Sequence, residues 1–149
     1  ADDFQGKERH KGYVKALQEA GFSYDPDRVV WFHTEDRKRK PALAVKQILE
    51  QGMKVDGIVC YNDQIAVDVI RALKELGKRV PEDISVTGYD NSFMAAGDLK
   101  LTTIAHPQEK LGEMAAELLL EKIREVKSQI PRLIQPEFIK GNSVIRRNP

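Results

Sequence analysis

Polar side chains that could bind a ligand follow several segments of the sequence that are predicted to be β-strands. Tyr61-Asn62-Asp63 comes directly after one apolar run, and Tyr89-Asp90-Asn91 follows another. His33-Thr34-Glu35 and the single residue His106 follow two further runs. Because open α/β sheets bind ligands beyond the carboxyl ends of their strands, we expect these side chains to share one rim of a sheet.

The first predicted helix adds a cation to this rim. Gln5, Arg9, Tyr13 and Leu17 fall on one stripe of a helix over residues 4–20. A charge on an inward face needs a partner, and for Arg9 this is a ligand or one of the acidic residues at positions 2 and 3. Carboxylates, amides, imidazoles and a guanidinium together suit a polyhydroxylated ligand, whose hydroxyls both donate and accept hydrogen bonds.

Each of these candidates also has a structural interpretation. Asp63 can cap the helix that it begins, and Asn62 can hold a tight turn. Asp90 can form an Asx-turn. His106 precedes a predicted helix start, where the helix dipole disfavours imidazolium, so a packing histidine is an equal alternative.

The composition excludes several classes of protein. The 149 residues carry 24 Lys and Arg against 23 Asp and Glu, a net charge of +1, unlike a strongly basic nucleic-acid-binding domain. One cysteine excludes a disulfide framework and a cysteine-built zinc site. This residue, Cys60, lies inside an apolar predicted strand and is expected to be a buried core thiol and not a nucleophile. No apolar run approaches the about 18 residues of a membrane span. We therefore expect neither membrane nor metal as a partner.

Enzyme motifs are also missing. The sequence has no Gly-rich phosphate loop ending in Lys-Ser/Thr, no His-Glu-x-x-His and no Gly-x-Ser-x-Gly. The basic run 37–40 is balanced by Glu35 and Asp36 and is predicted to be a solvated loop. We therefore expect a binding protein that uses no cofactor.

The predicted elements alternate between strand and helix. Strands are expected over 28–33, 57–61, 84–89, 101–105, 133–139 and 144–145, and further helices over 41–52, 63–76 and 107–126. The last helix has an apolar stripe that is expected to face inward: Leu111, Met114, Ala115, Leu118, Leu119 and Ile123. This alternation indicates an α/β fold whose parallel sheet carries helices on both faces. The chain begins at Ala1, and no strand precedes the first helix, so we expect it to be cut from a larger domain.

Two long segments, 57–66 and 80–91, resemble the effector domain of transcription regulators of the lactose-repressor/galactose-repressor type. The residues Arg9-x-x-Gly12-Tyr13 and the segment 101–104 continue the resemblance, which covers nearly all of the chain. Within that family, the segments 1–6, 60–63, 106–107 and 140–143 look most like the arabinose repressors.

The resemblance implies a periplasmic-binding-protein-like fold, a doubly wound parallel sheet built as two lobes, here truncated to mostly the C-terminal lobe. Residues 1–105 would form that lobe without its leading strand. Residues 106–127 would be a crossover helix belonging to the other lobe, and 128–149 would be the return strands. A missing lobe leaves a raw sheet edge or an exposed helix face, so we expect self-association.

The resemblance also implies a function. The chain would be the effector-sensing part of a cytoplasmic, sugar-responsive repressor and not an enzyme, with a secreted sugar-binding protein of a transport system as the alternative. The favoured effector is L-arabinose, and operator DNA would be bound only through a domain absent from this chain. A homodimer is expected; the apolar faces at 41–52 and 65–76 are candidates for its packing, with core packing as the alternative. The implied effector-binding residues are Arg9, Asn62, Asp90, Asp63, His106 and Gln5.

Overall fold

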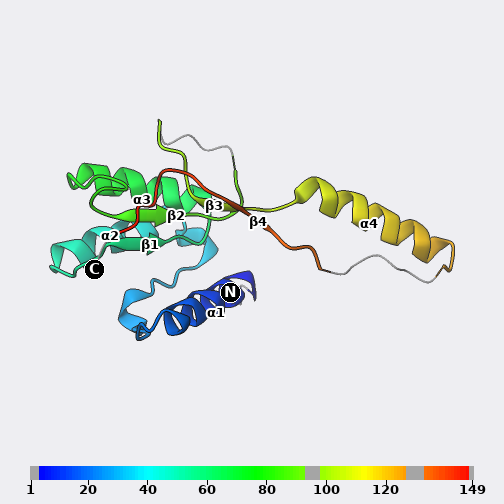
Figure 1. The fold of residues 1–149 in the computed structure, drawn as a ribbon, viewed down its shortest axis with the longest axis horizontal. Helices are drawn as coiled ribbons and strands as arrows, with labels where there is room; N and C mark the ends of the chain where they lie inside the picture. The colour runs from blue at the N-terminus through cyan, green and yellow to red at the C-terminus, as the bar shows by residue number, and fades with distance from the viewer. Residues whose placement is uncertain (1–3, 93–97, 127–132, 148–149) are drawn as a thin grey trace.

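The computed structural model describes residues 4–92, 98–126 and 133–147 (Figure 1). The helices are α1 (Phe4–Glu19), α2 (Lys40–Glu50), α3 (Asp63–Glu75) and α4 (Gln108–Ile123), with two 3-10 turns, η1 (Pro26–Arg28) and η2 (Thr34–Asp36). The strands are β1 (Gly57–Val59), β2 (Ser85–Thr87), β3 (Thr103–Ala105) and β4 (Glu137–Ile139).

The sheet is parallel in its first three strands and antiparallel in the last. Strands β1 and β2 pair in parallel, and two isolated parallel bridges, Thr87–Thr102 and Asp90–Ala105, continue this direction towards β3. Strand β4 pairs antiparallel with β3, because the chain leaves the body along β3 to reach α4 and returns beside it (Figure 1). The prediction of a parallel sheet is therefore right for three strands and wrong for β4.

Two of the predicted strands do not form. Residues 29–33 are flanked by the two 3-10 turns, and Val29 has an extended backbone with φ −113° and ψ 120°. This stretch nevertheless has no ladder partner within the described ranges, and an extended segment becomes a strand only when a neighbour takes its hydrogen bonds. Residues 144–145 likewise form no strand, and the predicted strand 133–139 shortens to β4.

The hydrophobic core lies where α2 and α3 pack on each other and α3 packs on β2. Helix α3 begins at Asp63, directly after its cap residue Asn62, and buries Ile65, Val69 and Leu73 in one cluster with Val86 of β2. Burying such a side chain stabilises the fold by about 1.5–3 kcal/mol. These apolar faces of α2 and α3, candidates for dimer packing, thus contribute to the core.

Helix α4 stands away from the rest of the molecule (Figure 1). It has no buried residue, so the expectation that its apolar stripe would face inward is wrong within this chain. The exposed helix face expected from the resemblance is present here: Leu119 is 61% exposed and Ile123 is 68% exposed. No helix in the described part of the chain is long and apolar enough to cross a membrane.

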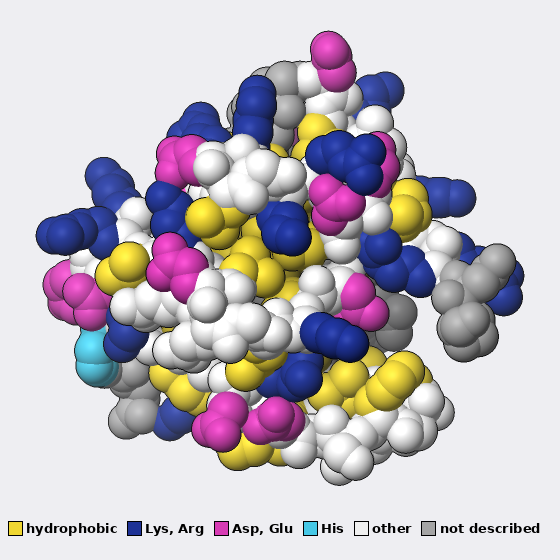
Figure 2. Space-filling view, turned by 90° about the vertical axis from the view of Figure 1, so that its left-hand side faces the viewer, with side chains coloured by type: hydrophobic (Ala, Val, Ile, Leu, Met, Phe, Trp, Pro, Cys, Tyr) yellow, Lys and Arg dark blue, Asp and Glu magenta, His cyan; other side chains and the backbone are white. Residues whose placement is uncertain are grey.

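The end of the molecule opposite α4 has a mixed surface (Figure 2). Lys and Arg side chains are interspersed there with Asp and Glu, with apolar side chains between them. Because positive and negative side chains alternate on this face, it has no strongly positive or strongly negative electrostatic potential, in accord with the net charge of +1.

Candidate functional site

The carboxyl ends of the three parallel strands meet at one rim. Tyr61 follows β1, Tyr89 follows β2 and His106 follows β3. The backbone N–H of Asp63 donates to the carbonyl of Tyr89 at 2.9 Å, and that of Asp90 donates to the carbonyl of Ile104 at 2.9 Å. These two bonds hold the three strand ends together, as the sequence predicted.

Arg9 reaches this rim from α1. Its Cζ lies 4.5 Å from the ring centroid of Tyr61 and 3.8 Å from that of Tyr89. Its Nη1 donates to the carbonyl of Tyr61 at 2.6 Å, and its Nη2 lies 3.7 Å from Oδ1 of Asp90. The acidic residues 2 and 3 lie outside the described residues, and the carboxylate that the structure places beside Arg9 is Asp90.

Asp90 lies in a strained turn. Its φ is 107° and that of Asn91 is 51°, both in the left-handed region that residues other than glycine rarely adopt. Strain of this kind is concentrated at functional sites. Burial raises the pKa of the Asp90 carboxyl; the Arg9 cation opposes this rise, and the neighbouring Asp63 carboxylate adds to it. The side chain is still 33% exposed, so a ligand can reach it.

Asn62 caps helix α3. Its Oδ1 accepts from the N–H of Ile65 at 3.0 Å, so the cap that the sequence suggested for Asp63 belongs to Asn62 instead. Capping uses only the amide oxygen. The amide nitrogen of Asn62 can therefore still donate to a ligand at the rim.

Asp63 is buried beneath the rim, with 2% of the residue exposed. Its Oδ1 accepts from the hydroxyl of Thr103 at 2.6 Å, and its Oδ2 accepts from the N–H of Ser92 at 2.8 Å. A Cβ at Gly88 would lie 2.1 Å from the same Oδ1. Asp63 thus ties the strand ends together from below.

Cys60 lies next to this buried carboxylate. Burial, with the nearby charge of Asp63, raises the pKa of the Cys60 thiol to about 12. A thiol that remains protonated at neutral pH is a poor nucleophile, which agrees with the prediction that Cys60 is a core residue.

Of the remaining predicted residues, His106 is the one for which the structure shows a contact with the rim. The His106 ring meets the Tyr89 ring edge-on, with centroids 5.6 Å apart. Gln5 is exposed on α1, one turn before Arg9. Phe32, the residue before the His33-Thr34-Glu35 segment, contacts the rim: its ring centroid is 6.3 Å from that of Tyr61.

The sequence analysis missed the contact of Arg9 with two tyrosine rings. The available signal was a tyrosine at the end of each of two predicted strands, Tyr61 and Tyr89, on the same expected rim. Among the described residues, no group of three His, Cys, Asp or Glu side chains is arranged to hold a metal ion.

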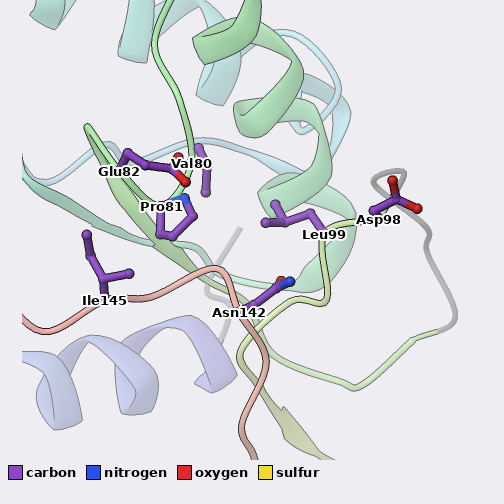
Figure 3. Close-up of a pocket in the computed structure, with 7 residues that line it drawn as sticks. All are labelled: Val80, Pro81, Glu82, Asp98, Leu99, Asn142 and Ile145. Carbon is purple, nitrogen blue, oxygen red and sulfur yellow. The ribbon is translucent and has the colours of Figure 1, made fainter.

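A separate hollow lies near the start of β2, away from the rim (Figure 3). Arg147 donates to the carbonyls of Pro81 and Glu82 at 2.8 and 2.9 Å beside it. Because α/β sheets bind ligands at the carboxyl ends of their strands, the rim is the better candidate site. The hollow is lined by Val80, Pro81, Glu82, Asp98, Leu99, Asn142 and Ile145.

Comparison with known proteins shows that this chain is similar in sequence to transcriptional repressors. A family model described as a periplasmic binding protein-like domain matches residues 1–144. The arabinose metabolism transcriptional repressor of Halalkalibacterium halodurans is 40% identical over 126 residues, which cover 83% of this chain and 34% of that protein. The HTH-type transcriptional repressor PurR of Yersinia pestis is 40% identical over 143 residues, covering 93% of this chain and 41% of that protein.

A solved structure agrees with the sequence comparisons. The LacI-family transcriptional regulator of Enterococcus faecium with bound ribose superposes with a TM-score of 0.73 at 32% identity, covering 91% of this chain and 50% of that one. The chain thus spans less than half the length of these two curated relatives.

Proposed function

This chain belongs to the periplasmic binding protein-like domain family, and from that membership we propose that it is the effector-binding part of a sugar-responsive transcriptional repressor. The similar repressors and the similar LacI-family regulator support this assignment. The effector binds at the rim formed by the carboxyl ends of β1, β2 and β3.

The observation that carries the proposal is the open ion pair between Arg9 and Asp90. Their nearest atoms are 3.7 Å apart, longer than a hydrogen bond, and both side chains are partly exposed. The carboxylate can accept from a sugar hydroxyl while the guanidinium donates to another oxygen of the same sugar. Because the two charges balance, the pair favours a neutral, polyhydroxylated ligand over an ion.

The finer proposal is a pentose, with L-arabinose as the first candidate. It is supported by the similarity to an arabinose metabolism repressor and by the ribose bound to the similar E. faecium regulator. Arg9 and Asn62 donate to the sugar and Asp90 accepts from it, while His106 and Gln5 line the edge of the site. Asp63 acts from below by holding the strand ends.

The proposed regulation involves parts outside this chain. Helix α4 packs in a second lobe, which supplies the other half of the site; its exposed apolar side chains, such as Leu119 and Ile123, support this. Sugar binding between the lobes changes the operator affinity of a separate DNA-binding domain in a cytoplasmic homodimer. Coupling between two such sites is typically about 1–3 kcal/mol.

Calorimetric titration of the intact protein with L-arabinose, D-ribose, D-xylose and D-glucose tests the proposal. We expect saturable binding of a pentose and a change in operator affinity at the same sugar concentration. Tight binding of a hexose alone would reject the pentose assignment. Sugar binding without any response in DNA binding would favour a sugar-binding protein of a transport system, and binding of no sugar would reject the function.

A further inference from the structure

Four side chains from different elements are in contact at the rim. Arg9 of α1 lies over the rings of Tyr61 and Tyr89, and the Tyr89 ring in turn meets the ring of His106 at an interplanar angle of 69°. Tyr61 follows β1, Tyr89 follows β2 and His106 follows β3. The series therefore joins the first helix to all three parallel strand ends.

Helix α1 does little by itself to fix Arg9. The helix has no buried residue, and the Arg9 side chain is 22% exposed. Arginine has a long side chain with high rotamer entropy, so an unrestrained guanidinium would lose much freedom on binding a ligand. Two aromatic faces and the carbonyl of Tyr61 at 2.6 Å restrain it before any ligand arrives.

We propose that Tyr61 and Tyr89 position the Arg9 guanidinium for effector binding, so that the two rings set the affinity for sugar through Arg9. This inference rests on the proposed function of the rim. The ring faces restrain the flat sides of the guanidinium, whereas its N–H groups point outward in the guanidinium plane. These N–H groups can therefore interact with Asp90 and with sugar oxygens. The tyrosine hydroxyls are not needed for this role, because the attraction of a cation to the ring comes from the ring face.

The first test compares leucine and phenylalanine at each tyrosine. We expect Tyr89→Leu to weaken sugar binding about tenfold in calorimetry of the intact protein, which corresponds to about 1.4 kcal/mol. We expect Tyr89→Phe to restore most of that affinity. The same pair of variants at Tyr61 should give the same ranking with a smaller loss, because its ring centroid is farther from Arg9 (4.5 against 3.8 Å). A phenylalanine variant as weak as leucine would overturn the role of the ring faces.

The second test separates positioning from direct contact with sugar. In an Arg9→Met background, a ring that acts only through Arg9 has nothing left to position. We therefore expect Tyr89→Leu to cause no further loss of affinity in that background. A full additional tenfold loss would mean that Tyr89 touches the sugar itself, and the proposal would be rejected.

The third test needs no ligand. In NMR spectra of the wild-type protein, the Cδ protons of Arg9 should be shifted upfield by the ring currents of both tyrosines. Tyr61→Leu and Tyr89→Leu should each remove part of this shift, while circular dichroism confirms that the variants are folded. Unshifted Arg9 protons in the wild-type protein would overturn the positioning role, whereas shifted protons in a protein that binds no sugar would reject only the proposed function.

Discussion

Asp63 and Asp90 are two carboxylates that follow neighbouring strands of one sheet, and their surroundings are opposite. Asp63 is 2% exposed, and its two oxygens accept from Thr103 and Ser92. The Asp90 side chain is 33% exposed and has its cationic partner Arg9 3.7 Å away. A position at the carboxyl end of a strand is therefore not enough to leave a carboxylate accessible to a ligand. Asp63 and Asp90 differ in whether their carboxylate oxygens already accept hydrogen bonds from other groups of the protein.

Removal of each carboxylate in turn should give the largest difference between Asp63 and Asp90. Asp63→Ala leaves the Thr103 hydroxyl and the Ser92 N–H without their acceptor, so we expect the free energy of unfolding to fall by about 3–5 kcal/mol. Asp90→Ala should cost under about 1 kcal/mol, because partly exposed ion pairs contribute little. Urea denaturation followed by circular dichroism measures both. Equal losses would contradict the division between a buried and an accessible carboxylate.

Gly88 offers a second test of the close packing around the buried carboxylate of Asp63. A Cβ there would lie 2.1 Å from Oδ1 of Asp63 and 2.7 Å from Cδ2 of Leu101. We expect Gly88→Ala to lower the free energy of unfolding by about 1–3 kcal/mol, the usual cost of overpacking.

Gly112→Ala is the matched control for that substitution. Gly112 lies in α4, and, apart from its chain neighbours and the backbone of its own helix, no heavy atom of the described residues comes within 4 Å of its added Cβ. Alanine is preferred to glycine in a helix, so this variant should be at least as stable as the wild-type protein. If Gly88→Ala were equally well tolerated in urea denaturation, the close packing around Asp63 would be refuted.

The affinity for sugar tests the role of the accessible carboxylate of Asp90. Asp90→Asn keeps the size of the side chain but removes the charge and replaces one acceptor oxygen by a donor. We expect calorimetry to show about a tenfold weaker affinity for the sugar, or about 1.4 kcal/mol. The free energy of unfolding should hardly change. An unchanged affinity in a folded variant would remove Asp90 from the site.

Sequence reasoning anticipated the rim because strand ends and helix faces follow from local patterns. The spacing of apolar residues predicted the four helices of the described residues, and the strand-end rule predicted a shared rim. The pairing of Arg9 with Asp90 was not predicted, because the expected partner of Arg9 was a ligand or an acidic residue at position 2 or 3. It could not assign the helix cap, because Asn62 and Asp63 are adjacent and both suit that role. Only the backbone angles at Asn62, φ −152° and ψ 176°, decide between them.

The predicted strand over 28–33 and the predicted inward face of α4 were wrong for a different reason, because among the described residues the first has no strand that pairs with it and the second buries no residue. An extended, β-branched stretch such as Val29-Val30 looks the same whether or not a neighbouring strand pairs with it. The apolar stripe of α4 likewise does not reveal whether its partner lies in this part of the chain. The periodicity of apolar residues predicts that one face of an element is packed. It does not predict the element that packs against that face, because this depends on contacts between residues distant in the sequence.

The smallest expected effect is a pH dependence of stability that belongs to Asp90. Because the folded state raises the pKa of Asp90 above its ordinary value of 3.8, it binds the proton more tightly than the unfolded chain does. Its contribution to stability is therefore greatest below pH 3.8 and is lost as the pH rises through the raised folded pKa.

The difference in unfolding free energy between the wild-type protein and Asp90→Asn should fall in the same way as the pH rises through this range. In Arg9→Met this range should extend to higher pH, because Arg9 is the cation that opposes the rise. A difference that grows in favour of the wild-type protein with rising pH would show instead that attraction to Arg9 outweighs burial at Asp90, and the two carboxylates would then differ only in accessibility.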